Sequence, residues 1–150
     1  MISFKMSKPV KQKKASKAAR TKRAKKKLWE LTTEYSRRKF ADHNGMVKCV
    51  TCETVKYWKE LQAGHWIPQA QGDSIRFELS NVNPQCYRCN INLGSNGPEY
   101  YKFMLDHYGQ EEMDRLLRRQ VEIVKFYESD YLDMIEDVRA KLKAMKEGER

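Results

Sequence analysis

The hydrophobic positions of the chain first repeat at helical spacing over residues 28–42. The pair Asn44-Gly45 follows and is a turn signal that ends this helix. Residues 54–60 and 64–68 have a different pattern, since they are rich in β-branched and aromatic side chains. The pattern therefore predicts one helix, then a short hairpin in which 54–60 and 64–68 pair with each other.

Three further helices are predicted in the second half of the chain. The first begins at Pro98 and ends at Gly109, the second continues to about Val121, and the last begins near Ser129, a favourable N-cap residue. The last helix carries an a/d seam of apolar residues spaced 4-3-4-3, namely Tyr131, Ile135, Val138, Leu142 and Met145. Such a seam packs either on its own domain or against a second copy in a homodimer, and the sequence leaves both open.

Charge is distributed very unevenly along the 150 residues. Residues 1–40 contain 15 of the 30 Lys and Arg and only two acids, a net charge of +13, while the other 110 residues have a net charge of −3. A basic segment attached to a mildly acidic remainder indicates a nucleic-acid partner. No apolar run approaches the ~18 residues of a membrane span, and the basic N-terminus lacks the apolar stretch of a signal peptide.

The basic segment 1–27 is predicted to be a disordered arm, because it has twelve Lys and Arg after position 4, no acids and almost nothing to bury. Each phosphate that such an arm neutralises releases counterions, so it would add affinity for DNA or RNA without reading sequence. A solubilising tail is the alternative. The candidate contacts are Lys11, Lys13, Lys14, Lys17, Arg20, Lys22, Arg23, Lys25, Lys26 and Lys27.

All four cysteines of the chain lie in two C-x₂-C pairs, Cys49 with Cys52 and Cys86 with Cys89, separated by 33 residues. Four thiolates at this spacing are typical of a tetrahedral structural Zn²⁺ site. Two disulfides are the first alternative, and an iron–sulfur centre is the second. Zinc is favoured because no secretory signal is present, and a reducing cytoplasm is expected.

Three polar residues occur in the order histidine, asparagine, asparagine, two of them before the second cysteine pair and one directly after it. His65 lies in the segment Gly-His-Trp-Ile-Pro, Asn81 precedes Cys86 by five residues, and Asn90 directly follows Cys89. A lone histidine beside aromatic residues is most often a packed core residue. The order His, Asn, Asn, in which the last asparagine directly follows a cysteine pair, also allows a functional interpretation of His65.

The complete pattern C-x₂-C … G-H-x-I-P … N-x₄-C-x₂-C-N resembles the HNH, or ββα-metal, nucleases built on a zinc-braced treble clef. Within them the chain most resembles the phage lambda NinG/Rap family of recombination proteins, and at the motif level phage recombination endonuclease VII. The resemblance spans about residues 47–109. It is carried by Trp58-Lys59-Glu60-Leu61, Ala63-Gly64-His65, Arg76-Phe77, Asn81-Val82-Asn83, Gln85-Cys86, Cys89-Asn90, Leu93 and Asn96.

The resemblance implies a role for each matched residue. His65 would be the general base that takes a proton from the attacking water, a task that suits a pKa near 6.5. Asn81 would hold the loop and orient the histidine, and Asn90 would offer its side-chain oxygen to a catalytic Mg²⁺ or Mn²⁺. The four cysteines would hold the structural zinc. Arg76 could hold a phosphate or be an ordinary surface arginine.

One departure from the nuclease pattern concerns the second ligand of the catalytic ion. Many of these nucleases have an aspartate just before the histidine, whereas this chain has Gly64, which offers no side-chain ligand. A carboxylate from Glu60, Asp73 or Glu78 could replace it. Otherwise the ion would depend on Asn90, water and phosphate.

The predicted organisation is a small α+β protein in four parts. These are a disordered arm (1–27), a helix and turn (28–46), a zinc-bound HNH-like core (47–109) and a helical region (110–150). The expected function is a metal-dependent DNA endonuclease of phage recombination, acting on branched DNA such as Holliday junctions or D-loops in the host bacterial cytoplasm. The alternative is a non-catalytic zinc-finger protein that binds DNA or RNA and needs neither His65, Asn81 nor Asn90.

Overall fold

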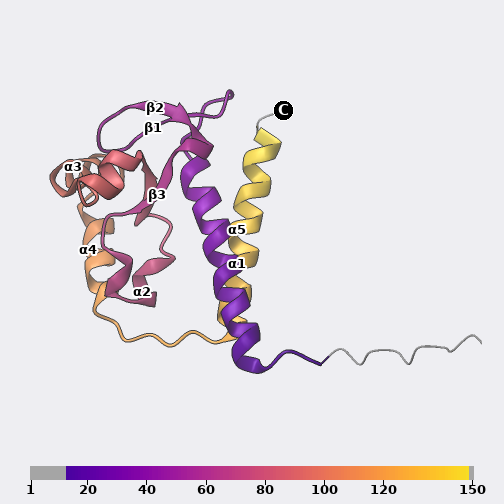
Figure 1. Cartoon of the computed structure of the whole chain (residues 1–150). Helices are drawn as coiled ribbons and strands as arrows, with labels where there is room; N and C mark the ends of the chain where they lie inside the picture. Colours follow the sequence, from indigo (N-terminus) through magenta and orange to yellow (C-terminus); the bar gives the residue numbers. More distant parts are fainter. Residues whose placement is uncertain (1–12, 149–150) are drawn as a thin grey trace, which may run out of the picture.

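The computed structural model describes residues 13–148 (Figure 1). Two long helices, α1 (Lys17–Arg38) and α5 (Glu128–Gly148), lie side by side and run in the same direction, and the smaller elements gather on one side of this pair. Their shared core contains Ala24 and Leu28 of α1 together with Tyr131, Ile135, Val138 and Leu142 of α5. The a/d seam is therefore buried within the chain, while a homodimer stays a prediction.

The predicted disordered arm is wrong for residues 17–27, which form the first half of α1. Ser16 caps the helix, since its side-chain oxygen accepts a hydrogen bond from the backbone N of Ala19 at 3.2 Å. Alanine, lysine and arginine all have high helix propensity, and Ala24 adds a buried contact in the middle of the basic segment. Residues 1–12, including Lys11, lie outside the described residues.

Two ion pairs attach the basic half of α1 to the rest of the protein. Arg20 pairs with Glu128 at the start of α5 at 3.2 Å, and Lys25 pairs with Asp73 at 2.8 Å. Both acids lie far from α1 in the sequence. The composition of this segment therefore does not show the contacts that attach it to the rest of the protein.

The strands form two separate antiparallel pairs. β1 (Met46–Lys48) pairs with β2 (Val55–Tyr57), and β3 (Gln62–His65) pairs with β4 (Val82–Gln85). The predicted hairpin between residues 54–60 and 64–68 is thus wrong. The turn at Cys49 and Cys52 folds β2 back onto β1, and a 3₁₀ turn, η1 (Trp58–Glu60), then directs the chain into the other pair.

Short helical segments flank β3 and β4. The 3₁₀ turn η2 (Gln69–Gln71) and helix α2 (Asp73–Arg76) lie between the two strands, and a π-helical turn, η3 (Arg88–Asn92), follows β4. The order strand, strand, helix around the second cysteine pair gives a small mixed α+β domain, as the sequence predicts.

The predicted pair of helices after Pro98 is present as α3 (Gly97–His107) and α4 (Gln110–Gln120), separated at Gly109 with φ = 85°. Tyr100 and Met104 of α3 and Met113 and Leu116 of α4 are buried with Ile67 and Ile75 in a second core cluster. The last helix, α5, begins at Glu128. Ser129 is therefore not its N-cap, and the side chain of Asp130 accepts a hydrogen bond from the backbone N of Tyr127 instead.

Candidate functional site

The four cysteines converge at one point of the structure. Their sulfur atoms all lie within 4.8 Å of one another, and the Cys52 and Cys86 sulfurs are 3.7 Å apart. A tetrahedral site with Zn–S bonds of about 2.3 Å has S···S edges of about 3.8 Å. All four cysteines are free, which argues against the disulfide alternative. The donor set and its geometry could therefore hold a metal such as zinc.

Hydrogen-bond donors are directed at these sulfur atoms. The backbone N of Cys89 donates to the Cys86 sulfur at 3.5 Å, and the amide of Asn96 donates to the Cys89 sulfur at 3.7 Å. The hydroxyl of Thr51 lies 3.3 Å from the Cys49 sulfur. Donors in these places would stabilise thiolates and orient them as ligands.

His65 ends β3 and is only 7% exposed. Its Nε2 lies 3.0 Å from the backbone oxygen of Arg76, and its ring stacks on Trp29 of α1 with 5.3 Å between centroids and 16° between planes. Burial lowers the pKa of His65 below its ordinary value, the Arg76 carbonyl opposes this, and the charge of Arg76 adds to it. The imidazole is therefore neutral at pH 7, and a proton on Nε2 would leave Nδ1 as the basic nitrogen.

Arg76, at the end of α2, forms a cluster with His65 and Trp29. Its guanidinium carbon lies 5.3 Å from the Trp29 ring and 5.6 Å from the Phe77 ring. The Nε atom is buried and has no hydrogen-bond partner among residues 13–148. A buried cationic donor without a partner is suited to an anion such as phosphate.

Asn81 is fully buried and closes the loop between β3 and β4. Its Oδ1 accepts from the backbone N of Ile67 at 2.8 Å, and its Nδ2 donates to the Ile67 oxygen at 2.9 Å. The backbone oxygen of Asn81 also accepts from Trp66, the residue after His65. Asn81 thus fixes the backbone next to the histidine.

Asn90 lies in η3, where its Nδ2 donates to Oε1 of Gln62 at 2.7 Å. Gln62 and His65 are the two ends of β3, about 10 Å apart at ~3.3 Å per residue, and their side chains point to opposite faces of the strand. The structure therefore brings His65, Asn81 and Arg76 together and holds Asn90 at the other end of the strand.

Gly64 has no room for a side chain. A Cβ atom at this position would lie 2.0 Å from Oε1 and 2.8 Å from Cδ of the fully buried Gln85. Gln85 is held in turn, since its Nε2 donates to Thr51 Oγ1 at 3.0 Å and to the Ser95 oxygen at 2.9 Å. The glutamine thus occupies the space into which an aspartate at position 64 would project.

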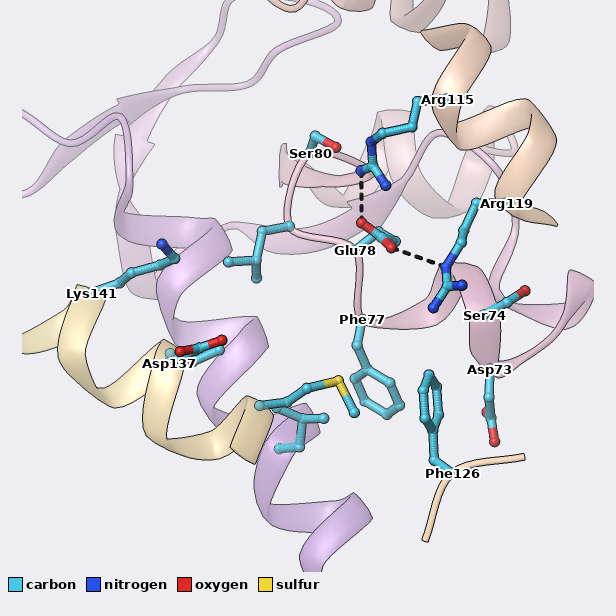
Figure 2. A pocket seen from close by; sticks show the side chains of 14 residues that line it. Asp73, Ser74, Phe77, Glu78, Ser80, Arg115, Arg119, Phe126, Asp137 and Lys141 are labelled. Carbon is cyan, nitrogen blue, oxygen red and sulfur yellow. Dashed lines mark hydrogen bonds and ion pairs between the residues drawn. The ribbon is translucent and has the colours of Figure 1, made fainter. Parts of the chain in front are cut away.

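The three carboxylates predicted as substitutes are each engaged elsewhere. Asp73 is paired with Lys25, and Glu60 accepts from the backbone N of Tyr57 at 3.2 Å. Glu78 is held by two arginines of α4, Arg115 at 2.8 Å and Arg119 at 3.4 Å (Figure 2). None of these contacts joins a carboxylate to His65 or Asn90.

The pairing of Glu78 also defines a cavity of about 360 Å³ between α5 and the segment after α2. Figure 2 shows its apolar side formed by Phe77 and Phe126, and its charged side by Glu78 with the two arginines. Arg115 and Arg119 thus connect α4 to the segment after α2.

The family model described as Bacteriophage Lambda NinG protein matches residues 3–149 of this chain. The chain belongs to this family. It is 27% identical over 97 residues to protein ninG of Escherichia phage lambda, a match that covers 61% of this chain and 47% of that protein. Protein ninG of Escherichia phage 933W and of Enterobacteria phage VT2-Sa each match at 27% over 97 residues, with 48% of their length covered.

The aligned part thus spans about half the length of these relatives. No solved structure matches the chain. The membership confirms the family part of the resemblance found in the sequence, while the relation to the HNH nucleases stays an expectation.

In this NinG-family chain a buried hydrogen-bonded network supports the strand that carries His65, and the sequence did not reveal it. Tyr100 donates to the backbone oxygen of Gly64 at 2.7 Å, and Asn83 donates to the Tyr100 oxygen at 3.1 Å. Tyr108 donates to Asn83 at 2.9 Å and accepts from Lys39 at 3.0 Å. The network thus connects α1, β4 and α3 to β3.

Lys39 is the charged end of this network. Its Nζ also donates to the backbone oxygens of Leu79 at 2.7 Å and Val82 at 2.8 Å. Burial lowers the pKa of Lys39 to about 7. Asn83 was the one signal available in the sequence, since it belongs to the quoted Asn-Val-Asn motif.

The predicted nucleic-acid contacts between residues 13 and 27 fall into two groups. Arg20, Lys25 and Lys27 are engaged in ion pairs with Glu128, Asp73 and Glu30. The other predicted contacts within the described residues are exposed and form no ion pair there, namely Lys13, Lys14, Lys17, Lys22, Arg23 and Lys26. Among the helices of residues 13–148, none is both long and apolar enough for a membrane span.

Proposed function

We propose that this protein is a metal-dependent DNA endonuclease of phage recombination, with His65 as the general base. Membership of the NinG family supports the phage context. The observation that carries the proposal is the contact of a neutral histidine with Arg76, whose buried Nε has no hydrogen-bond partner among residues 13–148. His65 has one ring nitrogen anchored on the Arg76 carbonyl, and the Arg76 side chain carries a buried donor that suits a phosphate.

In the proposed reaction, Nδ1 of His65 takes a proton from the water that attacks the scissile phosphorus. The hydrogen bond from Nε2 to the Arg76 carbonyl would fix the tautomer that this step needs and stabilise the imidazolium that forms. Arg76 would bind a phosphate oxygen, and Asn81 would hold the backbone at Trp66 and Ile67 so that the histidine stays at the end of β3.

Asn90 is the proposed ligand of a catalytic Mg²⁺ or Mn²⁺. Its Nδ2 is anchored on Gln62, so Oδ1 remains as an oxygen donor of the kind these ions prefer. Gly64 provides no second ligand, which makes this a weak site in the protein alone. A bound divalent ion would act as a Lewis acid on the phosphate.

The proposed substrate is branched DNA, such as a Holliday junction or a D-loop, in the cytoplasm of the bacterial host. The exposed lysines and arginine at the start of α1 would contact the backbone of any DNA, since phosphate contacts carry no sequence information directly. A preference of the protein for branched DNA over duplex DNA would then depend on the shape of its whole DNA-binding surface.

A second candidate is a non-catalytic protein that binds DNA or RNA through its cysteine centre and basic helix. Two observations favour it: His65 is only 7% exposed, and Asn90 lies at the far end of β3. In this case His65 would be a packed core residue.

The deciding experiment incubates the purified protein with a labelled four-way junction, a matched duplex and a single strand, with and without Mg²⁺. We expect Mg²⁺-dependent cleavage of the junction that falls by about 10²–10⁴-fold in His65→Gln. The matched control is His43→Gln, which changes an exposed loop histidine. Cleavage by His65→Gln at the rate of the control would remove His65 from the mechanism, and binding without cleavage by the parent protein would select the second candidate.

A further inference from the structure

Trp29 lies against His65 although 35 residues separate them in the sequence. The two rings are nearly parallel, with 16° between their planes and 5.3 Å between their centroids. Trp29 belongs to α1, outside the part of the chain that resembles the nucleases. One face of the imidazole is thus covered by a helix that the sequence pattern gave no role in the site.

The same indole ring also contacts Arg76. The guanidinium carbon of Arg76 lies 5.3 Å from the centroid of the Trp29 ring, and Phe77 meets the ring edge-on at 6.4 Å. Trp29 is therefore a common neighbour of His65 and Arg76, which come from different elements. Stacked contacts of this kind restrict the orientation of both side chains.

The position of Trp29 is set by the packing of α1. The adjacent Leu28 is 1% exposed and packs in the core shared with α5, so the helix cannot rotate without disrupting that core. Lys25, one turn earlier, is held by Asp73 of α2. These two contacts hold the part of α1 that carries the indole.

We infer that Trp29 is a positioning residue for His65, which it holds with the Arg76 carbonyl so that Nε2 keeps its proton and Nδ1 remains the basic nitrogen. The inference rests on the proposed function for the catalytic meaning of that nitrogen. Trp29 covers the ring face and excludes water from it, while the carbonyl fixes one edge. The indole also keeps the imidazole desolvated, and desolvation is the largest cause of its lowered pKa.

The charged group that acts on the imidazole from α2 is Arg76, which favours the neutral ring. On α1 the nearby cation Lys25 is engaged by Asp73. Removing the indole would therefore change the hydration of the ring, while Arg76 would keep its charge and lose its contact with the indole.

The test is nitrogen NMR of the histidine side chains in the zinc-loaded full chain, which reports the tautomer and the pKa of His65 directly. We expect Trp29→Ala to mix the two tautomers and shift the pKa of His65 upward, toward its ordinary value, while Trp29→Phe retains most of the parent behaviour. The matched control is Trp58→Ala, because the Trp58 ring contacts Arg37, Arg38 and Lys59 and lies outside this cluster. If Trp29→Ala does not fold, the comparison is made with Trp29→Leu.

A second measurement uses the pH profile of junction cleavage. The acid limb for Trp29→Ala should move to higher pH by the same amount as the NMR pKa, and Trp29→Phe should restore it. An unchanged tautomer and pKa in Trp29→Ala, with cleavage by the parent intact, would overturn the inference alone. Absence of cleavage by the parent would instead overturn the proposed function, and the catalytic meaning of Trp29 with it.

Discussion

The cysteine-bearing core and the α1–α5 helix pair are held together by different kinds of interaction. The core has strands of only three or four residues, four converging cysteines, and the fully buried amides of Asn81, Asn83 and Gln85. The helix pair has helices of 22 and 21 residues joined by an apolar seam. Directional polar contacts and the converging cysteines therefore define the core, and non-directional apolar burial defines the pair.

This difference decides how the stability of each region should respond to the substitution of one side chain. Metal ligands and buried hydrogen bonds act together, so that one missing member leaves others unsatisfied. An apolar seam loses stability in proportion to the contacts removed. The core should therefore fail abruptly and the helix pair gradually.

The largest effect is expected for Cys86→Ser. Structural zinc binding is worth on the order of 10–16 kcal/mol in small domains, and three thiolates leave the site incomplete. We expect loss of bound zinc and unfolding of the core, measured by metal analysis together with thermal melting. A variant that retained one zinc per chain and the parent melting temperature would contradict the assignment of the site.

A smaller effect is expected for Ile135→Ala in the helix pair. Ile135 is 3% exposed, and removing such a side chain typically costs about 2–5 kcal/mol. Zinc content should stay at the parent level, because the cysteines are elsewhere. Denaturant unfolding measures the loss, and release of zinc from the folded variant would show that the two regions are not independent.

A still smaller effect on the free energy of unfolding is expected from the protonation of His65, where the two regions meet, and it depends on pH. Burial lowers the pKa of the folded-state imidazole, so just below pH 6.5 the unfolded chain binds a proton that the folded chain does not. The free energy of unfolding should therefore rise with pH through this window and fall as the pH drops below 6.5. The comparison is between His65→Gln and its control, His43→Gln.

Denaturant unfolding at several values between pH 5 and 8 measures this dependence. Relative to His43→Gln, the His65→Gln variant should lack this stability loss on acidification, and the difference between them should be constant above about pH 7. Using the difference removes the contribution of zinc release at low pH, which both variants share. Parallel curves across the whole range would show that His65 is not buried as a neutral ring.

The smallest change in stability is expected on the exposed side of α1. Replacing Lys22, Arg23 and Lys26 together by Gln should alter the free energy of unfolding by no more than about 0.5 kcal/mol at each site. If all three contact DNA phosphates, the slope of log K against log salt should become shallower by about 2.7, from ~0.9 per phosphate.

The matched comparison for this triple variant is Arg20→Gln with Lys25→Gln, which removes two ion pairs worth about 0.2–1 kcal/mol each. Its slope should change less, because these two cations are engaged within the protein. Equal slopes for the two variants would show that the paired and the exposed cations of α1 contribute equally to DNA binding.

The sequence by itself determined the features that depend on neighbours along the chain. Two residues between the cysteines of each pair indicate a candidate metal site, Gly109 separates α3 from α4, and the 4-3-4-3 spacing predicts the buried face of α5. The ordered set of motifs from Trp58 to Asn96 was likewise sufficient for the family, which the family model confirms. Each of these signals lies within a short window or a fixed spacing.

Only the tertiary structure decided the features whose partners are distant in sequence. The first half of α1 is attached to Glu128 and Asp73 by ion pairs, and β3 pairs with β4 across an intervening loop. The side chain of Gln85 leaves room only for glycine at position 64. The contact of Trp29 with His65 and the distance of Asn90 from it have the same origin. Side-chain contacts of this kind follow from how elements pack, and no local pattern of residue types encodes them.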